Sequence, residues 1–194
     1  VMDGIEMLEK VKNDIRTSHI PVVMLTAKAD IDSRLAGLKR GADAYLAKPV
    51  DERELHIQLK NLVELRKKLY ERYASLEHIQ PTSDIYLKKE DDFMLKVKQV
   101  LETNLTDNEF GISQLCRELA MSHSQLYRKF KSLSNKTIAD FLKTLKLLKA
   151  RELLLTTNLN VTEITFAVGI KNLSYFSREF TREFGKSPSE FRKN

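Results

Sequence analysis

The segment VTEITFAVG (161–169), followed after four residues by SYFSREF (174–180), decides how the fold of this chain is interpreted. The second part repeats an earlier segment, SQLYRKF (124–130), because both have the pattern Ser-x-apolar-x-Arg-x-Phe. An internal repeat says more about architecture than a single motif does. We therefore expect both copies to adopt the same local structure.

The later copy has the pattern of two helices joined by a turn. In the first helix, Val161, Ile164 and Val168 fall on one face, and Asn160 with Glu163 has the spacing of a capping box. A left-handed glycine, Gly169, is expected to end this helix, and Asn172 or Ser174 to cap the next one. The second helix carries a buried aromatic stripe at every fourth residue, formed by Phe176, Phe180 and Phe184.

The earlier copy repeats this arrangement, with Ser122 and Gln125 at capping-box spacing. Its expected buried positions are Ile112, Leu115 and Leu119 in the first helix and Leu126, Phe130 and Leu133 in the second. Either copy alone is equally consistent with an amphipathic helix that has a solvated basic face. Two copies favour two helix-turn-helix units, at about 112–132 and 161–184.

One uninterrupted helix is predicted to join the two units, because residues 137–157 contain no Gly or Pro and have apolar residues at helical spacing. A helix of that length spans about 30 Å. Successive major-groove faces of B-DNA lie ~34–36 Å apart. The helix thus has the length needed to set two reading helices about one turn of DNA apart.

With these features, the chain from Ser83 to its end resembles the AraC/XylS-type DNA-binding domain, including the block GKSPSEFR (185–192). The resemblance implies a sequence-specific transcription regulator. Four positions depart from the residues usual in that family: Thr165 (usually Ala), Ile170 (Phe), Lys146 (Arg) and Asn135 (Gly). We expect the Thr165 hydroxyl to bond a carbonyl one turn earlier.

The resemblance places the outward face of each second helix in a DNA groove. Because an arginine fork matches guanine bidentately, Arg128 and Arg178 are the main candidates for contact with bases or nearby phosphates. Candidates for neighbouring base or backbone contacts are Ser124, Gln125, Tyr127, Ser174, Tyr175 and Ser177. Candidates for phosphate contacts, which position the protein without specifying a sequence, are Lys131, Lys136, Thr181 and Arg182.

The net charge of +6 is unevenly distributed. From Gly111 to the end, 15 Lys and Arg stand against 7 Asp and Glu, whereas residues 1–110 have 18 against 20. A basic C-terminal part predicts a polyanionic partner there, and double-stranded DNA is the expected one. The absence of aromatic pairs in a strand context argues against the common single-stranded RNA modules.

The N-terminal part alternates helices and strands. Strands are predicted in VVMLTA (22–27) and ADAYLAKPV (42–50), helices near the start and from Asp30 to Arg40, and a long helix from about Asp51. This is half of a doubly wound α/β domain. The predicted fold is therefore mostly α: an all-α double helix-turn-helix domain joined by a long helix to an incomplete, flavodoxin-like α/β half.

This part resembles the C-terminal half of a response-regulator receiver domain. The matching landmarks are Met2-Asp3-Gly4, Thr26, Tyr45 and Lys48-Pro49. The resemblance implies that Thr26 and Lys48 contact a phosphoryl group, that Tyr45 is an aromatic switch, and that Lys48-Pro49 is cis. The phospho-accepting aspartate and the carboxylates that hold Mg²⁺ belong to earlier strands. The sequence therefore has no phospho-acceptor, and Mg²⁺ is expected only in an intact receiver.

A bare half-sheet would expose a strand edge and apolar faces. We therefore expect the sequence to be a fragment, and residues 1–50 to be disordered, rearranged or packed against another copy. The expected boundaries are a partial receiver at 1–73, a linker at 74–84 that contains Pro81-Thr82-Ser83, and the DNA-binding domain at 85–194.

The helix predicted over 51–76 has two interpretations. Leu55, Leu62, Leu69 and Leu76 lie seven residues apart, so two chains could pair there as a homodimer. The alternative is that the first turns cover the receiver sheet and the rest is a solvated connector. The exposed half-receiver is a second possible dimer surface.

Catalysis has little support, because His19, His56, His78 and His123 are scattered without metal-ligand spacing. We expect no catalytic residue, metal or cofactor in this chain. Cys116, among apolar residues, is expected to be a buried structural thiol in a reducing compartment. Apolar runs are too short to span a bilayer, so a cytoplasmic location without membrane contact is expected for this segment.

Two functional classes remain. The first is the output part of a phosphorelay, a transcription regulator that reads two successive major-groove segments. The alternative is a phosphorylation-dependent interaction or dimerisation module with only non-specific polyanion binding. The intact protein would be a free-standing response regulator or the tail of a membrane-bound hybrid histidine kinase, with a histidine kinase or phosphodonor domain as partner.

Overall fold

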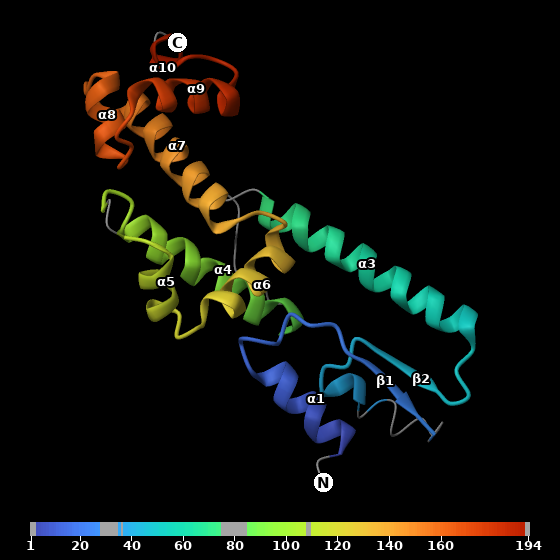
Figure 1. Ribbon diagram of the computed structural model, residues 1–194. Coiled ribbons are helices and arrows are strands. Elements are labelled where there is room, and N and C mark those ends of the chain that lie inside the picture. The colour runs from blue at the N-terminus through green and yellow to red at the C-terminus, as the bar shows by residue number, and fades with distance from the viewer. Residues whose placement is uncertain (1–2, 28–34, 36, 75–84, 108–109, 193–194) are drawn as a thin grey trace. The chain divides into compact units, whose positions relative to one another are not determined.

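The computed structural model describes residues 3–27, 35, 37–74, 85–107 and 110–192 (Figure 1). The chain divides into two compact units, Val1–Leu95 with Ser124–Asn135 and Lys96–His123 with Lys136–Asn194. The described residues are mostly helical and include a two-stranded parallel sheet, which confirms the predicted fold class.

The first unit begins with helix α1 (Gly4–Asn13), strands β1 (Val23–Thr26) and β2 (Ala44–Ala47) and helix α3 (Glu52–Ala74). The Asp3 carboxylate accepts the backbone N–H of Glu6 at 2.8 Å and so caps α1. The two strands pair in parallel, with Val23 opposite Ala44 and Thr26 opposite Ala47. The described part of residues 1–50 therefore forms the predicted helix and strands, and the expected packing against another copy stays a prediction.

One smaller expectation for this region is confirmed. The Lys48-Pro49 peptide bond is cis. Gly41 has a φ of +94°, a conformation that glycine adopts without strain, and it follows the helical residues 37–39. Most of the helix expected at 30–40 lies outside the described residues.

Helices α4 (Ile85–Thr103) and α6 (His123–Ser134) complete the first unit, with α4 continuing into the second unit after Leu95. An ion pair joins α3 to α4, because the Arg72 guanidinium donates to both carboxylate oxygens of Asp91, at 2.9 and 2.7 Å. The Tyr73 hydroxyl donates to the same carboxylate at 2.7 Å. On α6, the predicted anchors are all buried: Leu126, Phe130 and Leu133.

The second unit contains α5 (Ile112–Glu118), α7 (Ile138–Thr156), α8 (Val161–Ala167), α9 (Leu173–Phe184) and α10 (Pro188–Arg192). The predicted connecting helix is present as α7, which has 19 residues between caps at Thr137 and Thr157. At 1.5 Å per residue, α7 is about 29 Å long. Cys116 on α5 is only half-buried, so the expectation of a buried thiol was wrong: its side of this short helix is partly open to solvent.

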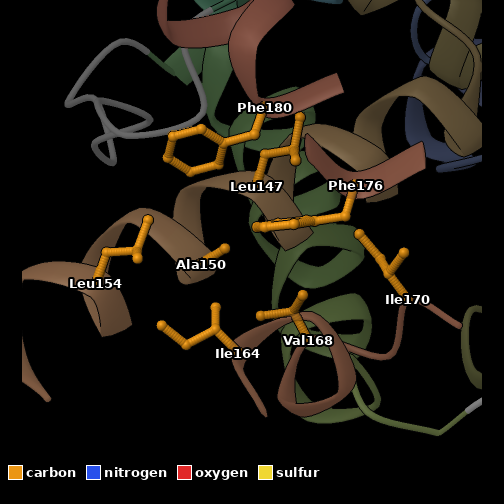
Figure 2. Packing of buried hydrophobic residues seen from close by; sticks show 8 residues of the cluster. All are labelled: Leu147, Ala150, Leu154, Ile164, Val168, Ile170, Phe176 and Phe180. Atoms are coloured by element: carbon orange, nitrogen blue, oxygen red, sulfur yellow. The ribbon is translucent and has the colours of Figure 1, made fainter. Parts of the chain in front are cut away.

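A single hydrophobic cluster holds α7, α8 and α9 together (Figure 2). Phe176 and Phe180 of α9 are fully buried against Leu147 and Ala150 of α7. The other members are Leu154, Ile164, Val168 and Ile170. Phe176 and Phe180 of the predicted aromatic stripe therefore form the buried face of α9, whereas Phe184 is half-buried beside the cluster. Ile170 fills a core position where the family usually has a phenylalanine.

The predicted helix ends of the second copy are confirmed. Asn160 accepts the N–H of Glu163 at 2.9 Å and donates its own N–H to the Glu163 carboxylate at 2.6 Å. Asn172 caps α9 by accepting the N–H of Tyr175 at 2.8 Å. Gly169 and Gly185 have φ values of +66° and +73°, as expected of glycines that end helices.

Candidate nucleic-acid interface

The outward face of α6 presents the residue types that were expected to contact DNA. Ser124, Arg128 and Lys131 are exposed, and Tyr127 is 45% exposed. Gln125 is half-buried. This face points outward because the opposite face of α6, with Leu126, Phe130 and Leu133, is buried.

Local contacts hold the cations of α6 along this face. The Arg128 Nε donates to the carbonyl of Ser124 at 3.2 Å. The Lys131 ammonium lies 5.7 Å from the centre of the Tyr127 ring, a cation–π contact. Lys136, beyond the end of α6, is half-buried. The exposed face of α6 is therefore cationic and partly pre-ordered.

The outward face of α9 has the same character. Ser174, Arg178 and Arg182 are exposed, and Tyr175 is 39% exposed. The Arg178 guanidinium lies 5.6 Å from the centre of the Tyr175 ring. The remaining predicted contacts are Ser177, which is half-buried, and Thr181, which is exposed but donates its hydroxyl to the carbonyl of Ser177 at 2.8 Å. The two faces belong to different compact units, so each is described separately as a candidate DNA-binding surface.

Two buried charges at equivalent positions of the repeat were not among the predicted site residues. Lys129 on α6 is fully buried, and Glu179 on α9 is 5% exposed. The Glu179 carboxylate lies 3.4 Å from the Lys143 ammonium of α7 and also pairs with Arg182. The repeat contained the signal, since both residues follow the repeated arginine and precede the repeated, buried phenylalanine.

A basic hollow next to the start of α9 was also missed. It has a volume of about 370 Å³ and is lined by Lys143, Lys146, Lys171 and Tyr175, among others. The Lys146 ammonium donates to the carbonyl of Gly169 at 2.8 Å, and burial lowers its pKa. Positive charge beside a helix N-terminus favours an anion such as a DNA phosphate.

Of the three predicted switch residues, Thr26 ends β1, Tyr45 lies within β2 and Lys48 follows β2. The carbonyl of Thr26 accepts the N–H of Lys48 at 2.7 Å, so the two segments stay paired beyond the strands. The Lys48 side chain is exposed, whereas Tyr45 is 9% exposed and directed inward. A methyl group on Gly37 would lie 3.1 Å from the Tyr45 ring, so the ring packs closely on that backbone.

Comparison with known proteins identifies the two halves of the chain. Residues 1–60 match the family described as response regulator receiver domain, and residues 115–194 match one described as helix-turn-helix domain. The chain therefore joins part of a receiver domain to an AraC-type helix-turn-helix domain. The chain is thus similar to DNA-binding transcription regulators of two-component signalling.

The similar proteins include a histidine kinase and response regulators or their domains. Histidine kinase P4 of Formosa agariphila is 33% identical over 98% of this chain, and transcriptional regulatory protein HptR of Staphylococcus aureus is 29% identical over 97%. The chain spans 14% of the length of the first and 74% of the second. The C-terminal domain of response regulator YesN from Fusobacterium nucleatum is 30% identical, with a TM-score of 0.47 over 52% of this chain and 98% of that domain.

Two features are absent from the described residues. Within residues 3–27, 35, 37–74, 85–107 and 110–192, no helix combines the length and apolarity needed to cross a membrane. The same residues contain no cluster of three or more His, Cys, Asp or Glu that could hold a metal ion.

Proposed function

We propose that the chain reads a specific double-stranded DNA sequence with two heads, α6 and α9, each placed in a major groove. The observation that carries this proposal is the repeated outward pattern, in which Ser124 and Arg128 on α6 match Ser174 and Arg178 on α9, all exposed. Arg128 and Arg178 contact bases, because a guanidinium can bond both acceptors of guanine. The cation–π contact of Arg178 with Tyr175 restricts the arginine before it binds.

The other outward residues support these contacts. Ser124, Gln125, Tyr127, Ser174, Tyr175 and Ser177 contact bases or the backbone beside the arginines. Phosphates are met by Lys131, Lys136, Thr181 and Arg182, which position the heads without reading bases. The engaged hydroxyl of Thr181 favours a positional role, because its proton is already donated within α9.

In an intact receiver, Thr26 and Lys48 contact the phosphoryl group and Tyr45 switches between orientations. That receiver would use Mg²⁺ and an aspartate from earlier strands, and a histidine kinase or phosphodonor domain would supply the phosphoryl group. The similarity to a histidine kinase over 98% of this chain supports a hybrid kinase as the parent protein. The output part of such a protein would act in the cytoplasm, where the DNA is.

Substitution of the two arginines tests the reading heads. Arg128→Ala and Arg178→Ala should each cost about 1–3 kcal/mol on the preferred duplex and relax specificity at separate base positions. Lys131→Ala is the control from the same face, since loss of a phosphate contact weakens binding to all sequences alike. An equal loss on every sequence for the arginine variants would reassign them to backbone contacts.

Dimerisation through α3 stays a prediction. The heptad residues Leu55, Leu62 and Leu69 are half-buried, and Leu76 lies outside the described residues. Between them, Ile57 and Val63 are 59% and 55% exposed. Sedimentation equilibrium of the chain and of Leu62→Glu distinguishes the two interpretations, because only a heptad interface loses dimer with that change.

A further inference from the structure

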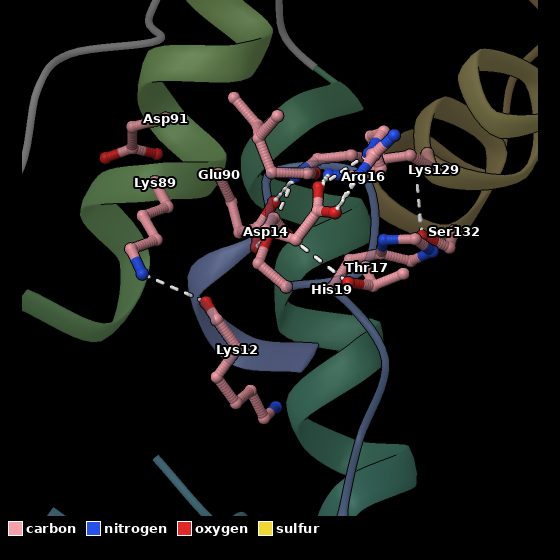
Figure 3. Close-up of polar contacts among 12 residues, drawn as sticks. Lys12, Asp14, Arg16, Thr17, His19, Lys89, Glu90, Asp91, Lys129 and Ser132 are labelled. Atoms are coloured by element: carbon pink, nitrogen blue, oxygen red, sulfur yellow. Dashed lines mark hydrogen bonds and ion pairs between the residues drawn. The ribbon is translucent and has the colours of Figure 1, made fainter. Parts of the chain in front are cut away.

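Lys129 lies on the inner face of α6, fully buried among three segments of the first unit (Figure 3). Its ammonium is 2.7 Å from the carboxylate of Glu90 on α4. It also donates to the carbonyl of Ile15 at 2.6 Å and to the Ser18 hydroxyl at 2.9 Å. The same ammonium lies 4.7 Å from the centre of the Phe93 ring. The partners of this charge thus come from α4 and from the segment after α1.

The contacts around Lys129 form a closed network. The Ser18 hydroxyl accepts from Lys129 and donates to Glu90 at 2.7 Å, so it bridges both charges. Arg66 of α3 adds a bond of 3.0 Å to the carbonyl of Ser132, also on α6. Burial lowers the pKa of Lys129, and the neighbouring Glu90 counteracts this. Removing one partner would leave a buried charge unpaired, so segment 14–19, α4 and α6 are expected to move together.

The equivalent charge on α9 is anchored differently. The Glu179 carboxylate is paired with Lys143 of α7 at 3.4 Å and with Arg182 of its own helix. Arg178 lies 3.7 Å from it. All of these partners are in the second unit. The repeated position therefore holds charges of opposite sign: Lys129 pairs with groups of α4 and of segment 14–19, and Glu179 pairs with groups of its own unit.

We propose that Lys129 is a positioning residue through which receiver segment 14–19 sets the orientation of the first reading head. The second head is held by Glu179 and α7 without that segment. The Lys129 network does not cover the DNA-binding face, because Tyr127 and Arg128 stay exposed while it is formed. The network instead sets the orientation of α6. This inference rests on the proposed reading of DNA by α6 and α9.

The test uses the 194-residue chain and its preferred duplex. Arg128→Ala and Arg178→Ala first define which base positions each head discriminates. Ser18→Ala removes only the bridging hydroxyl, and Lys129→Met keeps the length of the side chain without its charge. Both should reduce discrimination at the Arg128 positions about fivefold, within the usual range of coupling between sites, and leave the Arg178 positions unchanged. Lys129→Arg should restore part of the loss.

Glu179→Gln is the matched control from the equivalent position of the repeat. It should reduce discrimination at the Arg178 positions and leave those of Arg128 unchanged. Hydrogen exchange gives a readout that a purely structural role would not change. Duplex binding should slow exchange of the amides in 15–20 in the unmodified chain, and should no longer do so in Ser18→Ala or Lys129→Met.

Two kinds of result overturn the proposal. If Ser18→Ala and Lys129→Met weaken binding equally on all sequences, or leave the Arg128 positions unchanged, Lys129 does not position the head. If duplex binding does not slow the exchange of the amides in 15–20, the receiver segment is not coupled to DNA binding by α6. If Lys129→Met does not fold, Ser18→Ala decides alone. An unmodified chain without any sequence preference refutes the proposed function itself, which separates that failure from the other two.

Discussion

The Thr165 hydroxyl donates a hydrogen bond of 2.7 Å to the carbonyl of Val161, one turn earlier in α8. This confirms the bond expected at a position where the family usually has alanine. Thr165 is 1% exposed, so its hydroxyl would be costly to bury without this partner. The local bond explains why a polar, β-branched residue is accepted in the core of the second unit.

Thr165→Ala should therefore change the free energy of unfolding by less than about 1 kcal/mol. The variant loses a methyl group and one bond but gains helix propensity, and these effects nearly cancel. Urea unfolding measures the difference. Thr156→Ala is the control, because Thr156 makes the same bond to Glu152 on an exposed surface. A loss above about 2 kcal/mol at Thr165 would mean that methyl packing dominates.

Ala120 follows α5 with a φ of +51°, a conformation that costs an L-residue roughly 1–2 kcal/mol. Because Ala120 is exposed, Ala120→Gly should relieve this strain without loss of packing and stabilise the protein by about 1 kcal/mol. Ala139→Gly, at an exposed position inside α7, should destabilise by about 0.5–1 kcal/mol. Thermal unfolding compares the two variants, and the same sign for both would contradict the assigned strain.

Gly169 combines a φ of +66° with close surroundings. A Cβ there would lie 2.6 Å from the carbonyl oxygen of Leu105 and 3.0 Å from the Lys146 ammonium. Gly185 has a φ of +73° but nothing within 4 Å of a Cβ. Gly185→Ala should therefore cost only the conformational term of about 1–2 kcal/mol, and Gly169→Ala clearly more. Equal losses in denaturant unfolding would show that the backbone around Gly169 relaxes freely.

The buried side chain of His19 should make the stability of the first unit depend on pH. Burial lowers the pKa of His19 from 6.5 to about 4, and Lys129, Arg66 and Lys12 add to this shift against Glu90. Between these two pH values the unfolded chain binds a proton that the folded chain does not, so stability should fall as the pH drops from 6.5 towards 4. His19→Gln should flatten that slope in urea unfolding at several pH values. An unchanged slope would place the titrating group elsewhere.

The elements predicted well from the sequence are those determined by near neighbours. The capping box of Asn160 and Glu163 needs only residues three apart, and the burial of Phe176 and Phe180 follows from helical spacing. The register of α9 and the capping box of α8 could therefore be predicted without tertiary information. The outward positions of Arg128 and Arg178 followed from the same periodicity, which is why the candidate DNA-binding face was found.

The remaining features depend on partners far away in sequence. Lys129 looks like one more cation of a basic helix, and its burial follows only from Glu90 and the carbonyl of Ile15, 114 residues away. Glu179 likewise looks solvated until α7 brings Lys143 to it. Charged residues are almost never fully buried unless paired, so the burial of these two positions depends on their partners in other elements.

The central claim is that two heads, α6 and α9, read one duplex. Its most direct measurement is selection of bound duplexes from a random pool, followed by footprinting and a salt titration on the preferred sequence. We expect two protected major-groove segments ~34–36 Å apart for each chain, with affinity falling steeply as salt rises. Diffuse protection that is indifferent to sequence would contradict the two-headed reader and leave only non-specific attraction to a polyanion.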